Sequence, residues 1–311
     1  MSNDNVKLSL NDLNKKGREK VYAKRKAVAV SGDVTLALHE TVPTAAGKTR
    51  RLSRLFCGEH KQMHKLTLIW LAVIAGLCLI TAAVYPLVKV AFSEMTAMID
   101  SLPEIWQDMI VAMFGLMDTF VNYYILSAGL GMMVGLFAGI IAGNVFSKDN
   151  KGNAAEFLYS MPISRNKIAA VKLGVLVSIV TLFNAGIALF SLIMAWCFSG
   201  GEVIAYGTLF AHFGSILLMS LLIAAFVFGL SMLSKKRIGL GLALGLVLIM
   251  YFLFIISAVD PAVEFIKYFT PMGIPTMIGT PFEWAVAVVW AGLALVTLVA
   301  GFVRFKRQDL V

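Results

Sequence analysis

The segment Ser147–Lys172 reads SKDNKGNAAEFLYSMPISRNKIAAVK and is the longest polar interruption in an otherwise apolar stretch of the chain. Asn153 followed by Glu156 is typical of a helix N-cap with an acidic residue in the first turn. The spacing predicts a short helix over residues 154–160. This helix ends before Pro162, because a proline disfavours helical geometry in the residue that precedes it. This helix would carry apolar side chains that require a covering surface, either a partner protein or the bundle itself: Phe157, Leu158 and Tyr159.

The composition indicates an integral membrane protein. Of 311 residues, 59% are hydrophobic and 14% are charged, and the mean hydropathy is +0.82. Soluble domains carry about 25% charged residues. The three cysteines are scattered and none has CxxC spacing, which argues against a disulfide framework or a zinc site.

Six apolar stretches reach the length of about 20 residues that a membrane-spanning helix requires. The expected fold is therefore all-α, a polytopic bundle of six transmembrane helices within residues 50–311. Residues 1–49 are expected to be a disordered, basic, cytoplasmic tail, and residues 50–65 an amphipathic helix at the membrane interface. Ser164 is placed to cap the third span. The predicted spans cover residues 66–88, 121–146, 168–198, 206–233, 238–259 and 284–303.

The distribution of charge predicts the topology. Residues 1–65 contain 14 Lys and Arg, residues 147–172 contain 5, residues 235–237 contain 3 and the C-terminus contains 3, together 25 of the 27. Six spans place all four regions on one side, which the positive-inside rule assigns to the cytoplasm together with both termini. The opposite side would hold Lys89, Lys267 and nine acidic residues. A basic tail beside anionic lipid needs no nucleic acid as a partner.

The second span carries four glycines at intervals of four residues, which place them on one ridge of a helix. Such a ridge allows close approach of another helix, and we expect helix packing there. The glycines are Gly131, Gly135, Gly139 and Gly143.

The spans offer little chemistry of their own. His212 is the only ionisable residue well inside a predicted span, and it is interpreted either as a packed, hydrogen-bonded residue or as an ion-coupling group. No HExxH, GxSxG or GxxxxGK[ST] motif occurs. We therefore expect a protein that is not an enzyme and binds no cofactor itself.

Several motifs together resemble the ABC-2 type permease family, the membrane subunits of ATP-binding-cassette exporters. The central segment has Lys151-Gly152, then Glu156-Phe157-Leu158, then a run from Ser160 to Arg165 that reads SMPISR, and then Lys172. Two further matches are Tyr268-Phe269-Thr270-Pro271 and the C-terminal FKRQDL. The resemblance covers residues 50 to 311. The chain departs from the family pattern in having one acid rather than two before Lys151-Gly152.

The resemblance implies a function and its partners. The cytoplasmic loop 147–167 would form a coupling helix that docks on a separate nucleotide-binding subunit, which would hold ATP and Mg. Two permeases would pair as a homodimer or heterodimer in the cell membrane, expected to be a bacterial inner membrane. The docking residues implied here are Gly152, Glu156, Phe157, Leu158, Pro162 and Arg165.

Three functions remain open from the sequence. The first is the permease subunit of an exporter for a hydrophobic or amphipathic substrate, such as a peptide, drug or lipid. The second is a non-transporting membrane scaffold or sensor that binds a cytoplasmic partner through loop 147–167. The third, a secondary transporter, depends only on His212.

Overall fold

The structure is a computed structural model. It describes residues 45–99, 103, 119–147, 164–234, 240–259, 261–275 and 282–307. By its contacts the chain divides into two units, Met1–Arg51 and Leu52–Val311, and the packing described below lies within the second. Every regular element in the described ranges is a helix, which confirms the all-α prediction.

Helix α2 runs without interruption from Ala45 to Ile99, with Pro86 inside it. The structure therefore joins the predicted interfacial helix and the predicted first span into one helix. One face of α2 is buried at intervals of three or four residues, as a single packed helical face requires: Ile74, Cys78, Ala82 and Tyr85.

The predicted second span is two helices rather than one. Helix α4 (Phe120–Ser127) and helix α5 (Leu130–Ser147) meet at a bend of 44°. Gly129 lies between them with a φ of +54°, a left-handed conformation that residues with a Cβ rarely adopt. The amide of Ala128 closes α4 on the Tyr124 carbonyl, so the bend is built into the backbone.

Three long helices follow: α7 (Arg165–Phe198), α8 (Tyr206–Leu233) and α10 (Trp284–Arg307), with α9 (Leu240–Val259) between the last two. In the described residues, four helices are long and apolar enough to cross a membrane, or five if α4 and α5 form one bent span. The apolar part of α9, Ala243–Ser257, is shorter than the others. The count of six spans and the cytoplasmic termini thus remain predictions.

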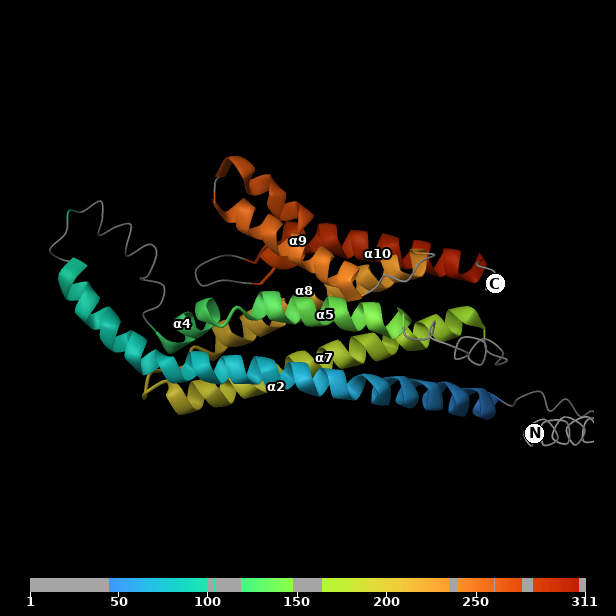
Figure 1. The fold of residues 1–311 in the computed structure, drawn as a ribbon, viewed down its shortest axis with the longest axis horizontal. Helices are drawn as coiled ribbons and strands as arrows, with labels where there is room; N and C mark the ends of the chain where they lie inside the picture. The colour runs from blue at the N-terminus through green and yellow to red at the C-terminus, as the bar shows by residue number, and fades with distance from the viewer. Residues whose placement is uncertain are drawn as a thin grey trace, which may run out of the picture. The chain divides into compact units, whose positions relative to one another are not determined.

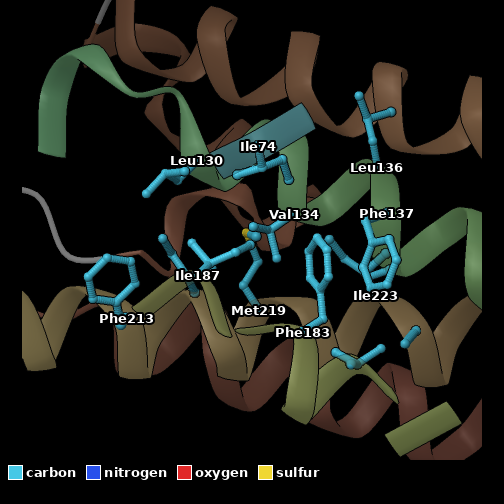
Figure 2. Close-up of a cluster of buried hydrophobic side chains, with 14 of the residues drawn as sticks. Ile74, Leu130, Val134, Leu136, Phe137, Phe183, Ile187, Phe213, Met219 and Ile223 are labelled. Carbon is cyan, nitrogen blue, oxygen red and sulfur yellow. The ribbon is translucent and has the colours of Figure 1, made fainter. Parts of the chain in front are cut away.

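Helix α8 lies at the centre of the bundle and packs against α5, α7 and α10 (Figure 1). Figure 2 shows the core where these helices meet, including Phe137 of α5 and Phe183 of α7, whose rings stack with centroids 3.6 Å apart. Asn184 is a polar residue of this core, and its side chain is paired. The Asn184 amide donates to Ser220 Oγ at 3.1 Å, as expected for a side chain shielded from water.

Two short 3-10 helices, η3 (Pro261–Phe269) and η4 (Pro271–Gly273), connect α9 to the segment before α10. Thr270 between them is fully buried, and its hydroxyl donates to the Met250 carbonyl at 2.7 Å. Since Met250 is in the middle of α9, this connection folds back into the bundle rather than lying at its end.

Candidate functional site

The two ends of the predicted coupling loop are described by the structure. Helix α5 ends at Ser147, and α7 begins at Arg165, which is half-buried. Ser164 is the N-cap of α7, but it caps through its carbonyl and its hydroxyl makes no capping bond. Five predicted docking residues lie outside the described residues: Gly152, Glu156, Phe157, Leu158 and Pro162.

A buried ion pair lies directly beside these two helix ends. Lys172 Nζ is 2.9 Å from Glu59 Oε1, and the two side chains are 1% and 6% exposed. The same ammonium donates to the Val145 carbonyl oxygen at 3.1 Å. The ammonium of Lys172, which lies on α7, thus connects this helix to α2 and to the last turn of α5. We call Lys172, Glu59 and the Val145 carbonyl the Lys172 junction.

Each component of the Lys172 junction has a physical reason for its place. The carbonyl of Val145 is among the last four of α5, which have no partner within their own helix. A cation near a helix C-terminus also interacts favourably with the helix dipole. Glu59 supplies the opposite charge that a buried ammonium requires. Removal of any one group would leave another buried without compensation.

A second polar cluster lies at the opposite end of α7, where the chain turns into α8. Glu202 Oε1 accepts hydrogen bonds from Tyr85 Oη at 2.7 Å and from the Lys89 ammonium, while Oε2 accepts from the backbone N–H of Phe120 at 2.9 Å. Partial burial raises the pKa of Glu202, but these hydrogen bonds lower it more, and the pKa lies below its ordinary value. We call this set the Glu202 cluster; it joins α2, α4 and the α7–α8 turn.

The two clusters give α7 a polar attachment near each of its ends. Lys172 lies 7 residues after the first residue of α7, and Glu202 lies 4 residues after its last. In the described residues, Glu59 and Lys172 are the only buried charged side chains. No group of three or more His, Cys, Asp or Glu that could hold a metal occurs there either. The arrangement is suited to fixing helices relative to one another.

The glycine ridge of α5 faces several neighbouring elements. A Cβ added at Gly135 would lie 2.8 Å from Met272 Cε of η4, and one added at Gly139 would lie 2.7 Å from Val247 Cγ2 of α9. At Gly131 the nearest atom is Pro275 Cγ at 3.8 Å. The fourth glycine of the ridge, Gly143, is buried.

His212 is buried on α8, two turns from its start. Its carbonyl accepts a hydrogen bond from Ser215 Oγ at 2.7 Å. The side chain lines a small cavity of about 140 Å³ beside the α4–α5 bend, together with Tyr251 of α9.

Sequence reasoning missed Glu59 and Glu202 because their partners are distant in the chain. A signal for Glu59 was present: it is the only carboxylate among six Lys and Arg between Ala45 and Lys65. Lys172 belongs to the motif that resembles the permease family, but the sequence did not indicate that it is buried or paired with Glu59.

Comparison with known families identifies the family of membrane proteins to which this helix bundle belongs. Residues 68–310 match the sequence model described as ABC-2 family transporter protein. The chain belongs to this family. As an ABC-2 family membrane protein it is expected to associate with an ABC-type ATP-binding subunit, and members are typically non-enzymatic membrane components. No curated protein matches the chain by sequence.

Membership accounts for the general features of the molecule. The match begins within the apolar part of α2 and extends through α10, so it includes every apolar helix of the bundle. For an ABC-2 family protein, the Lys172 junction has a notable position, because it lies where the loop between α5 and α7 joins the helices. The Glu202 cluster lies at the other end of the same helix.

Proposed function

We propose that this chain is the permease subunit of an ABC exporter, driven by a separate ATP-binding subunit. The observation that carries the proposal is the Lys172 junction. A displacement of the loop between α5 and α7 acts on both helix ends that flank it. Because Lys172 also binds Glu59, the same displacement acts on α2.

The buried ion pair is better explained by the specific helix arrangement that it fixes than by a gain in net stability. Burying two charges costs desolvation energy, and apolar replacements of similar volume are often neutral or stabilising. A buried ion pair that adds little net stability can still specify one arrangement of the three helices that it joins. We infer that ATP binding by the partner subunit changes this arrangement through the loop, and that the bundle responds as a unit.

The substrate we propose is hydrophobic or amphipathic. Among the described residues, the only buried charges are those of the Lys172 junction, and they neutralise each other. No chain of ionisable side chains is therefore available in these ranges for the passage of a small ion. A molecule that partitions into lipid requires no such chain.

Two permease subunits are expected to pair above two ATP-binding subunits in the cell membrane. The mass of the purified complex in lipid nanodiscs measures this stoichiometry. One permease per complex would contradict the paired arrangement.

The test of the proposal is co-purification with an ATP-binding subunit. The tagged protein is extracted in mild detergent, and the substitutions Phe157→Asp and Leu158→Asp are made together to place charge on the predicted docking face. Asn150→Asp is the matched control, since it adds a negative charge to the same loop outside that face. We expect the double variant to lose the ATPase and the control to retain it.

The outcomes separate the exporter from its rival. If no ATP-binding subunit accompanies either the unmodified protein or the control, the exporter is contradicted and a scaffold or sensor is favoured. If the double variant retains its ATPase, the loop residues 157 and 158 are not the docking contact.

A further inference from the structure

An apolar groove of about 830 Å³ lies between α8, α9, α10 and η3. Its volume falls in the range of about 300–1,000 Å³ that is common for ligand pockets. Among the described residues no charged side chain lines it, and its walls include Phe226, Met250, Phe269, Trp290, Gly292 and Leu293. One wall is formed by exposed residues of α10, so the groove opens on the outside of the bundle.

The groove has space along a helix where a larger side chain would fit. A Cβ added at Gly292 would meet no atom within 4 Å. The residues of α10 that line the groove extend from Val288 to Val296, about 12 Å along the helix axis. These dimensions favour an elongated, flexible occupant over a compact one.

Trp290 provides the groove with one unsatisfied polar group. This side chain is 3% exposed and packs edge-to-face against Phe226, with ring centroids 5.3 Å apart. Its Nε1 is buried and has no hydrogen-bond partner in the described part of the chain. Buried polar groups normally have a partner, so an occupant with an acceptor oxygen is favoured. Neighbouring atoms cover the nitrogen in this structure, so such an oxygen would reach it only if the indole changed its orientation.

Three charged residues form a group beside Tyr268 at the η3 end of the groove, which we take as its mouth, and together these three described residues carry a net charge of −1: Glu264, Lys267 and Glu283. Lys267 is paired with Glu264 at 2.7 Å and with Glu283 at 3.3 Å, and its ammonium stands 5.7 Å from the centre of the Tyr268 ring, which lines the groove. The hydrogen bond from Lys267 lowers the pKa of Glu264, and this carboxylate is ionised at neutral pH with or without that shift. The side chain of Glu264 is 59% exposed and can bind a further cation.

We propose that this groove binds a membrane phospholipid whose headgroup carries an ammonium group. One acyl chain lies along the apolar walls, an ester oxygen accepts from Trp290, and the ammonium is held by Glu264 and Glu283. The apolar lining matches the chain, and the charge at the mouth matches the headgroup. The inference depends on a membrane environment and is independent of any ATP-binding partner.

Quenching of Trp290 fluorescence by brominated acyl chains tests the proposal. A variant that retains only Trp290 is made by replacing Trp70, Trp106, Trp196 and Trp284 with Phe. It is reconstituted in bilayers that contain dibrominated phosphatidylethanolamine or dibrominated phosphatidylglycerol. A variant that retains only Trp196, which is 78% exposed, reports contact with bulk lipid.

We expect Trp290 to be quenched despite its burial, and the ethanolamine lipid to be preferred about two- to fivefold, as for partly exposed ion pairs. Glu264→Gln with Glu283→Gln should remove this preference. Gly292→Phe should fill the groove and abolish most of the quenching. The matched control is Gly214→Phe on α8, where an added Cβ also meets nothing within 4 Å and which does not line the groove.

Three results would overturn the proposal. Weak quenching that Gly292→Phe leaves unchanged would mean that no chain occupies the groove. Equal quenching by both lipids would refute the proposed recognition of an ammonium-bearing headgroup. Rapid disulfide formation between two copies carrying Leu293→Cys would show a second copy of this chain in place of lipid. Should the four-Phe variant fail to fold, native mass spectrometry of the wild type against Gly292→Phe serves instead, with loss of one retained phosphatidylethanolamine expected.

Discussion

Gly229 of α8 faces the backbone of Thr297 on α10 so closely that an added Cβ would lie 2.7 Å from the Thr297 carbonyl carbon. A backbone atom cannot move aside as a flexible side chain can. The two helices can therefore pack at this distance only if position 229 has no side chain.

We accordingly expect Gly229→Ala to destabilise the bundle by about 1–3 kcal/mol, the usual cost of overpacking. Thermal unfolding in detergent measures the effect. Gly214→Ala, on the same helix and with no atom within 4 Å of its added Cβ, is the control. The control should be stabilised slightly, because alanine favours helix over glycine by about 0.5–1 kcal/mol. Equal unfolding temperatures for the two variants would contradict the close contact.

Lys172→Met should destabilise the protein by about 3–5 kcal/mol, because it leaves the Glu59 carboxylate buried without its cation. Glu59→Met together with Lys172→Met should recover most of that loss, since two apolar side chains of similar volume replace the pair. Unfolding of the two variants measures the difference.

The same double variant tests whether the junction transmits motion. In the proposed exporter, substrate is expected to stimulate ATP hydrolysis by the complex of the unmodified protein with its ATP-binding subunit. If the double variant keeps its fold, we expect its complex to hydrolyse ATP without this stimulation. Retained stimulation would restrict the Lys172 junction to a structural role. Glu59→Lys with Lys172→Glu restores opposite charges and should recover part of the stimulation.

The lowered pKa of Glu202 predicts that the folded protein loses stability in acid. Its pKa in the folded protein is lowered from an ordinary value of 4.5, so its contribution is fully present above that value. The contribution is lost as the pH falls through the lowered folded value, where the carboxylate becomes protonated. Unfolding temperatures measured between neutral pH and pH of about 3 should fall for the wild type and fall less for Glu202→Gln. Parallel curves would show that other groups cause the acid sensitivity.

Gly139→Ala should destabilise the contact between α5 and α9, because the new methyl group would overlap with Val247 Cγ2. Val247 is β-branched and has few alternative rotamers in a helix. Val247→Ala in the same chain should therefore relieve the overlap. A double-mutant cycle on unfolding free energy should give a coupling of about 0.5–3 kcal/mol. Strict additivity would mean that the two positions do not touch.

Hydropathy was a good guide to the long helices. Tyr206 and Trp284 begin α8 and α10, and the same residues begin the predicted fourth and sixth spans. Composition over about 20 residues determines such elements, so local sequence suffices to find them.

Other features depend on geometry or on long-range contact. The bend at Gly129 depends on the φ angle of this one residue. Hydropathy averaged over about 20 residues does not detect a single backbone angle. The burial of Glu59 depends on Lys172, 113 residues later in the chain. Neither periodicity nor a count of charges pairs two such residues, so the sequence did not identify Glu59 or Glu202 as parts of the site. The prediction that the loop 147–167 docks on a partner stays a prediction, since residues 148–163 lie outside the described residues.

Helix α7 contains 34 residues and is about 51 Å long, well beyond a hydrocarbon core of about 30 Å. It has no proline or positive φ in its interior, so it behaves as one stiff rod. A rotation of 5° about its midpoint would move its two ends by about 2 Å in opposite directions. Lys172 lies on this helix, so such a rotation acts directly on its contact with Glu59. Glu202 lies four residues beyond the end of α7, so the rotation reaches its contact with Tyr85 through the turn that contains Gly200 and Gly201. In the proposed exporter, where α7 crosses the membrane, this one helix would link the Lys172 junction at one membrane face to the Glu202 cluster at the other.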